Sequence, residues 1–169
     1  MAETGVLADD DRVELVGGEI IEMSPIGKRH AACVDRLTRL LSKLGDQLIV
    51  RVQGPIQVDQ YSEFQPDFAL LRSRNDFYAS SLPLPNDILL VIEVADSTVE
   101  YDRLMKVPAY ARAGIPESWL VDLPADRIEL NAFPVNEQYS VTRSVSRGEG
   151  IESETIHDLK LFVDEIIGE

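Results

Sequence analysis

Apolar and polar residues alternate near the start of the chain in two short runs, 13–16 and 19–23, on either side of Gly17-Gly18. Alternation with a period of two is typical of a strand, and a Gly-Gly pair suits a two-residue turn. We therefore predict a β-hairpin here, ended by Ser24-Pro25. The residues before it are polar and acidic, and we expect 1–10 to be frayed.

Apolar positions spaced three and four residues apart predict two helices. The first spans 28–45, where five side chains recur on one face: His30, Val34, Leu37, Leu41 and Leu44. The second spans 99–113, with an expected inner face of Leu104, Val107, Tyr110 and Ala111. Pro108 should kink this helix or mark a late start, since proline lacks the N–H that a helix interior requires.

The remaining apolar runs predict strands. Strands are expected at 48–52, 56–58, 66–71 and 117–122, with a hairpin formed by 127–133 and 138–143. Residues 88–94 read Ile-Leu-Leu-Val-Ile-Glu-Val, a nearly continuous apolar run that is typical of a central strand buried on both faces. Residues 72–87 predict a surface excursion, and 159–167 fit a strand or a helix equally well. The sum is an α/β fold with a mixed sheet flanked by helices and an N-terminal β-hairpin.

Length and composition indicate one domain, 1–169, in the cytoplasm. A chain of 169 residues fits one core, and no apolar run approaches the roughly 20 residues that span a bilayer. The first residues lack the basic and apolar regions of a signal peptide. The single cysteine, Cys33, has no partner for an internal disulfide, and no acid orients it with His30 as a nucleophile–base pair, so we reject a cysteine hydrolase.

The charge distribution constrains the partners. A net charge of −14 argues against a protein that grips phosphate backbones over its whole surface. One segment differs, because 28–43 contains five basic residues and one acid, Asp35. These basic residues are Lys28, Arg29, Arg36, Arg39 and Lys43. A local basic face is therefore compatible with the acidic total.

Two carboxylates in strand contexts are the strongest candidates for chemistry. Glu93 interrupts the apolar run 88–94, and burying an unpaired carboxylate costs several kcal/mol, so Glu93 must be paired or metal-bound, or lie where the strand reaches solvent. Asp67 follows Pro66 at a strand start. Two carboxylates at neighbouring strand ends suit Mg²⁺ or Mn²⁺, and Lys106 on the following helix could offset charge on a phosphoryl group. The alternatives are an acid beside a turn, a structural ion pair for Glu93 and a solvated lysine.

Two weaker candidates complete the predicted catalytic set. His30 faces inward at the start of the first helix, where a core histidine is the more frequent explanation. Glu19 directly follows the Gly-Gly turn, although a solvated strand face is the simpler interpretation of Glu19 and Glu22.

Three strings, taken together, resemble the Uma family of putative restriction endonucleases. The first is Val-Glu-Leu-Val-Gly-Gly-Glu-Ile-Ile-Glu-Met-Ser-Pro (13–25), followed by His30. The second is Gln-Pro-Asp-Phe-Ala-Leu (65–70), and the third is Val-Ile-Glu-Val-Ala-Asp-Ser-Thr (91–98), followed by Asp102, Lys106, Tyr110 and residues 114–122. The resemblance covers roughly 11–133, and the order and spacing of the strings are more specific than any one of them.

The resemblance implies a restriction-endonuclease-like fold of the PD-(D/E)XK nuclease group. By that resemblance Asp67 and Glu93 are metal ligands, together with the main-chain carbonyl of Val94. The wider group places its lysine two residues after the second acid, where this chain has Ala95. The resemblance therefore assigns the lysine to the next helix, at Lys106.

The leading hypothesis is a Mg²⁺- or Mn²⁺-dependent endonuclease that hydrolyses DNA phosphodiesters. A catalytically inactive binding or regulatory domain with the same fold is the alternative, favoured by the acidic composition. A phosphodiesterase acting on RNA or a small molecule would share the site. A basic cleft around the three residues would favour nucleic acid, and an acidic rim would favour the binding domain. A homodimer is an expectation from the frequency of two-fold dimers alone.

Overall fold

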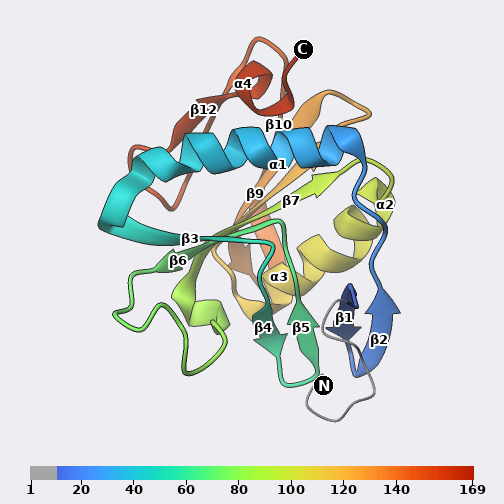
Figure 1. The fold of residues 1–169 in the computed structure, drawn as a ribbon, viewed down its shortest axis with the longest axis vertical. Coiled ribbons are helices and arrows are strands. Elements are labelled where there is room, and N and C mark those ends of the chain that lie inside the picture. The colour runs from blue at the N-terminus through green and yellow to red at the C-terminus, as the bar shows by residue number, and fades with distance from the viewer. Residues whose placement is uncertain (1–10) are drawn as a thin grey trace.

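In the computed structural model the described residues are 11–169, so the frayed segment expected at 1–10 lies outside them. The strands of Figure 1 are β1 (Val13–Val16), β2 (Glu19–Glu22), β3 (Leu48–Val52), β4 (Ile56–Asp59), β5 (Ser62–Phe64), β6 (Phe68–Arg72), β7 (Ile88–Ala95), β8 (Glu117–Asp122), β9 (Arg127–Val135), β10 (Gln138–Ser146), β11 (Gly150–Glu152) and β12 (Lys160–Phe162). The helical elements are α1 (Lys28–Leu41), η2 (Ser42–Gln47), η3 (Pro85–Asp87), α2 (Val99–Tyr101), η4 (Asp102–Lys106), α3 (Val107–Ala113) and α4 (Val163–Ile167). Within 11–169, no helix has the length and apolar character needed to cross a bilayer.

A six-stranded mixed sheet forms the centre of the fold, in the order β10-β9-β8-β7-β6-β3. Strands β7 and β8 run parallel, and the other neighbouring pairs in this sheet are antiparallel. The connection between β7 and β8 passes through α2, η4 and α3, as a parallel pair requires. The mixed α/β fold predicted from the sequence is confirmed.

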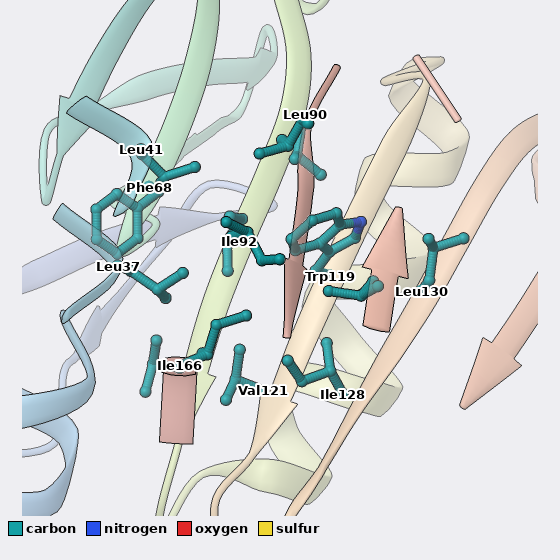
Figure 2. Close-up of a cluster of buried hydrophobic side chains, with 14 of the residues drawn as sticks. Leu37, Leu41, Phe68, Leu90, Ile92, Trp119, Val121, Ile128, Leu130 and Ile166 are labelled. Carbon is teal, nitrogen blue, oxygen red and sulfur yellow. The ribbon is translucent and has the colours of Figure 1, made fainter. Parts of the chain in front are cut away.

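Strand β7 is buried on both faces, as its apolar run predicted. On one face Leu90 and Ile92 pack with Trp119 and with Leu37 and Leu41 of α1, which crosses the sheet (Figures 1 and 2). On the other face, Val91 belongs to a second cluster that includes Tyr110 of α3. Helices on opposite faces therefore hold β7 in place, and Glu93 stands near its end.

The N-terminal hairpin is present, with Val16 opposite Glu19 in β1 and β2. It is part of a four-stranded antiparallel sheet, ordered β2-β1-β5-β4, that the sequence did not predict as a unit. The link is made by β5, whose Glu63 lies opposite Leu15 of β1. Ser62 Oγ also accepts a hydrogen bond from the Gly17 N–H at 3.0 Å. The hairpin is thereby fixed against the body of the protein.

The helix expected over 99–113 is divided by a π-helical turn, η4, in which the Val107 N–H donates to the Asp102 carbonyl. Pro108 directly follows the π-turn, as the second residue of α3, where the helix already departs from regular i to i+4 bonding. The wider turn changes which side chains face inward. Leu104 is 64% exposed, contrary to the expected inner face, while Asp102 and Lys106 are each 4% exposed. π-Turns occur often at functional sites.

The segment at 159–167, left open between strand and helix, contains both β12 and α4. A buried carboxylate anchors the preceding residues to β8. Glu117, with 0% exposure, accepts hydrogen bonds from Trp119 Nε1 at 2.7 Å, Ser153 Oγ at 2.7 Å and Thr155 Oγ1 at 2.7 Å. The Glu154 and Thr155 N–H groups donate to it as well. This carboxylate therefore joins the β11–β12 region to the central sheet.

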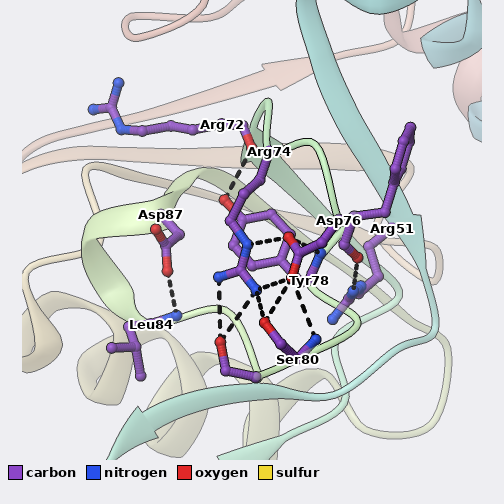
Figure 3. A network of polar contacts seen from close by, with 10 residues as sticks. Arg51, Arg72, Arg74, Asp76, Tyr78, Ser80, Leu84 and Asp87 are labelled. Carbon is purple, nitrogen blue, oxygen red and sulfur yellow. Dashed lines mark hydrogen bonds and ion pairs between the residues drawn. The ribbon is translucent and has the colours of Figure 1, made fainter.

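The surface excursion expected at 72–87 is ordered by its own polar contacts (Figure 3). Arg74 Nη2 donates to Asp76 Oδ2 at 2.8 Å, and the Arg74 guanidinium lies over the Tyr78 ring, 4.1 Å from its centroid. Arg51 Nη2 donates to the Phe77 carbonyl at 3.2 Å. Phe77 and Tyr78 have φ of 50° and 61°, an unfavourable conformation for bulky residues, which this network holds in place.

Candidate active site

The sheet register brings Asp67 and Glu93 together. Phe68 of β6 lies opposite Ile92 of β7, so the preceding residue, Asp67, stands beside Glu93. Asp67 Oδ2 accepts a hydrogen bond from the Val94 N–H at 2.8 Å. Asp67 is 8% exposed and Glu93 4% exposed. The two acids that the sequence singled out are therefore adjacent and buried.

Lys106 reaches the same place from η4. Its Nζ lies 3.1 Å from Glu93 Oε1 and 2.8 Å from Glu14 Oε1. Tyr110, one turn further along, donates its hydroxyl proton to Glu93 Oε1 at 2.5 Å. The π-turn makes this possible because it directs Lys106 inward, with Asp102 Oδ1 4.0 Å from the same ammonium. The sequence analysis left open that Lys106 is a solvated lysine, and its burial excludes that alternative.

The electrostatics follow from burial and from the excess of acids. Desolvation raises the pKa of Glu93 well above its usual value, although the Lys106 charge acts in the opposite direction. Desolvation also raises the pKa of Asp102 to about 6. Burial alone would lower the pKa of Lys106, but Glu93, Glu14 and Asp102 outweigh it and raise that pKa. Lys106 is therefore held as a cation at neutral pH.

His30 contacts Asp67 from the first turn of α1. Its Nε2 lies 3.0 Å from Asp67 Oδ1, which also accepts a hydrogen bond from Gln53 Nε2 at 3.2 Å. The Nδ1 atom of His30 is buried and has no hydrogen-bond partner among residues 11–169. The orientation of the Asp67 carboxylate is thus fixed by His30, Gln53 and the Val94 N–H.

Glu14 is the site residue that the sequence analysis missed. It is 4% exposed, and its Oε1 accepts the Gln65 N–H at 2.8 Å in addition to contacting Lys106. Glu19, which the sequence analysis preferred, is exposed at the start of β2, and the structure does not bring it to this cluster. In the sequence, Glu14 has the same alternating context as Glu19 and Glu22, so only the position of β1 beside β5 distinguishes it.

Cys33 lies on the inner face of α1 and is buried in the core. Burial raises the pKa of its thiol to about 12. A thiol with such a pKa is protonated at neutral pH and is a weak nucleophile. This environment agrees with the rejection of a cysteine hydrolase.

A cavity of about 850 Å³ lies between the β1–β2 hairpin, the start of α1 and the α2–η4 segment. It is lined by Glu14, His30, Asp67, Glu93 and Lys106, among others. Its lining is strongly acidic. The lining acids are Glu14, Glu22, Asp67, Glu93, Asp96, Glu100, Asp102 and Asp122. The lining residues that carry a positive charge are Arg12, Arg103 and Lys106. The sequence analysis expected a basic cleft for a nucleic-acid enzyme and an acidic rim for a binding or regulatory domain, so this acidic lining favours the second.

The donor set fits a hard divalent cation. Mg²⁺ usually takes one or two protein carboxylates, keeps several waters and binds substrate phosphate oxygens. Asp67 and Glu93 provide two adjacent carboxylates, and Val94 lines the cavity beside them. Among 11–169 there is no group of three or more His, Cys, Asp or Glu residues arranged to enclose a metal. An open site completed by water and substrate is the arrangement that these residues could support.

Comparisons with known proteins identify a family and a similar fold. The family described as "Uma2: Putative restriction endonuclease" matches residues 3–164. The fold is similar to the crystal structure of a putative nuclease belonging to DUF820 from Anabaena variabilis, with a TM-score of 0.75 and 12% sequence identity. That similarity covers 98% of this chain and 94% of the other. No curated protein matches the chain.

Proposed function

Because the chain belongs to the Uma2 family of putative restriction endonucleases, we propose that it is a metal-dependent nuclease that hydrolyses DNA phosphodiester bonds. The observation that carries the proposal is the adjacency of two buried carboxylates, Asp67 and Glu93, the second of which lies 3.1 Å from the Lys106 ammonium. Nucleases of the restriction-endonuclease-like kind generally use divalent metal ions. A bound Mg²⁺ or Mn²⁺ would polarise the phosphate and lower the pKa of a water.

The acids and their supports have separate roles in this proposal. Asp67 and Glu93 hold the cation, with the main-chain carbonyl of Val94 as a further ligand. His30 and the Val94 N–H hold the Asp67 carboxylate in one orientation, which reduces the rearrangement needed on binding. Tyr110 does the same for Glu93 through its hydroxyl proton.

Lys106 acts in this proposal as a fixed positive charge. Its pKa is raised by Glu93, Glu14 and Asp102 once their attraction outweighs the desolvation of the ammonium. A lysine that keeps its proton is a poor general base at neutral pH, but it offsets the negative charge that develops on a phosphoryl group under attack. The burial of Lys106 strengthens this effect because water screens it little.

The experiment is calorimetric titration of Mn²⁺ and Mg²⁺ into the wild type, Asp67→Asn, Glu93→Gln and a control, Glu22→Gln. Glu22 is an exposed acid that lines the same cavity away from the pair. We expect both site variants to lose the metal, with circular dichroism unchanged, and the control to bind like the wild type. Equal binding by all four proteins, repeated with an oligonucleotide present, would exclude this site.

The acidic cavity lining favours one alternative, a nuclease-fold binding or regulatory domain without catalysis. In that case the three acids around Lys106, which are Glu14, Glu93 and Asp102, would serve an ion-pair network only. The titration separates the two functions, because a purely structural network would bind no divalent cation. The homodimer and the cytoplasmic location remain predictions from the sequence.

A further inference from the structure

Helix α1 presents an exposed row of basic side chains. Leu37 and Leu41 define its buried face, and Lys28, Asp35 and Arg39 project on the opposite side. Lys43 follows one turn later, in η2, and is exposed as well. We call Lys28, Arg39 and Lys43 the basic row. It contains three of the five basic residues that the sequence analysis noted in 28–43.

The charges of the basic row are not neutralised by neighbouring acids. Within 11–169, Lys28, Arg39 and Lys43 take part in no ion pair within 4.0 Å. By contrast, Arg103 and Arg127 each contact Asp122 and Glu129. Asp35 is the one acid that α1 carries on the same exposed side, which leaves a net positive charge along it.

The basic row begins at the cavity and leads away from it. Gly27 and His30, at the start of α1, line the cavity that contains Asp67 and Glu93. From there α1 crosses the sheet to its far side (Figure 1). At 1.5 Å per residue, the distance from Lys28 to Lys43 is about 22 Å, the length of about six stacked nucleotides at 3.4 Å each.

We propose that the basic row binds the phosphate backbone of a nucleic acid strand whose reacting phosphate enters the cavity. This inference rests on the proposed nuclease function and assigns its substrate-binding surface. A protein of net charge −14 repels a polyanion over most of its surface, so a strand is attracted where cations stand unpaired. Replacing counterions on the strand by lysine and arginine supplies affinity without reading sequence.

The test compares two triple variants with the same change in net charge. Lys28→Gln/Arg39→Gln/Lys43→Gln removes the basic row. Arg112→Gln/Arg143→Gln/Lys160→Gln removes three exposed cations from other surfaces. Binding of a labelled 20-nucleotide single strand and of the matching duplex is measured by fluorescence anisotropy over a range of NaCl concentrations. Ca²⁺ replaces Mg²⁺ to hold back hydrolysis.

We expect the basic-row variant to bind at least one form of the oligonucleotide about tenfold more weakly at low salt. The slope of log K against log salt should decrease by about 2 for three lost contacts to a single strand. The control variant should remain within about twofold of the wild type. Equal weakening of both triple variants would show a response to net charge alone, and unchanged binding by the basic-row variant would also overturn the inference. The single-strand and duplex arms decide which form the row holds.

A second measurement separates this inference from the proposed function. Hydrolysis of bis(p-nitrophenyl) phosphate, which is too short to reach the basic row, should have equal kcat/KM in the wild type and the basic-row variant. An equal loss on this substrate and on long strands would indicate damage to the site, and would contradict a role in binding the strand. If the wild type hydrolyses no phosphodiester, the proposed nuclease function fails, while the anisotropy result still decides whether the row binds nucleic acid.

Discussion

At the scale of single residues, Lys106 and the acids around it determine the behaviour of the site. One buried ammonium lies between Glu14 and Glu93, with Asp102 slightly further away. Buried charges of this kind stabilise a fold only while each has a partner. The site is therefore sensitive to the loss of its single lysine, and less sensitive to the loss of one acid.

We predict that Lys106→Met lowers the free energy of unfolding by about 3–5 kcal/mol at pH 8, the range measured when one member of a buried ion pair is removed. The double variant Lys106→Met/Glu93→Gln should lose less than Lys106→Met alone, because one of the three carboxylates left without a cation is then absent. Urea denaturation of the wild type, both single variants and the double variant measures the coupling. Strictly additive losses would contradict the ion-pair network.

Asp102 should make stability depend on pH in a defined direction. Its pKa is about 6 in the fold, raised mainly by desolvation, against an ordinary 3.8. The folded protein therefore holds a proton between these values that the unfolded chain has released. The contribution of Asp102 to the free energy of unfolding is therefore full below about pH 4 and is lost as the pH rises to about 6. The loss amounts to up to about 3 kcal/mol, at about 1.36 kcal/mol per pKa unit.

The measurement is the free energy of unfolding of metal-free wild type and Asp102→Asn between pH 4 and pH 7. The difference between the two proteins isolates Asp102 from Glu93, whose raised pKa acts in the same direction. We expect the wild type to lose more stability than the variant over this interval. Parallel curves for the two proteins would show that Asp102 does not titrate there.

Sequence alone could identify Glu93 but not its partner Glu14. A glutamate within Ile-Leu-Leu-Val-Ile-Glu-Val conflicts with its apolar neighbours, and that conflict is visible without a structure. Glu14 alternates with Val13 and Leu15 as a solvated strand residue would. Its burial arises from the pairing of β1 with β5, a contact between residues about 50 positions apart.

At the scale of secondary structure, the π-turn η4 is the element that the sequence could least specify. Apolar spacing predicted an inner face containing Leu104, but the i to i+5 hydrogen bond at Val107 rotates Lys106 inward instead. Helical periodicity assumes 3.6 residues per turn, so the prediction was wrong for Leu104 within the wider turn, whereas Tyr110 and Ala111 after it are buried as expected. Long, regular elements such as α1 and β7 were predicted well for the opposite reason.

The anchor at Glu117 leads to a prediction for the β11–β12 region. Glu117→Gln replaces an oxygen that accepts hydrogen bonds by an amide that donates, so the N–H groups of Glu154 and Thr155 lose an acceptor. We expect a loss of about 3 kcal/mol or more, from several hydrogen bonds to one charged group. Amide hydrogen exchange should accelerate in 150–162 more than in β3 or β6. Glu152→Gln, an exposed change in β11, is the control.

At the scale of the whole molecule, a metal-free fold that concentrates carboxylates should gain stability from a cation. Mn²⁺ that binds only the folded state at 100 times its Kd would add about 2.7 kcal/mol. For a protein of this size, that corresponds to a rise in Tm of about 5–10 °C. Glu93→Gln should show no such rise. Thermal denaturation at constant ionic strength, with NaCl as the control salt, measures it, and an equal rise in the variant would place the cation elsewhere.

The fold class followed from the sequence because the long-range pattern is regular: a buried central strand, a helix on each side and a closing hairpin. The four-stranded sheet of β2, β1, β5 and β4 did not, because strands of three and four residues carry little periodicity. The cavity lies between this small sheet and the larger one's neighbouring helices. Its acidic lining therefore depends on an arrangement that no local pattern encodes.

The Glu117 anchor also sets an order of events during synthesis. The site residues lie between positions 14 and 110. The strand beside Glu93 is β8, and its Glu117 carboxylate accepts hydrogen bonds from residues 153–155. At 5–20 residues per second, those donors leave the ribosome's catalytic centre about 3–12 s after Glu93. During that interval, the central sheet lacks its last support. A nascent chain would therefore contain both carboxylates of the pair, Asp67 and Glu93, before the donors that hold the neighbouring strand at Glu117 have been made.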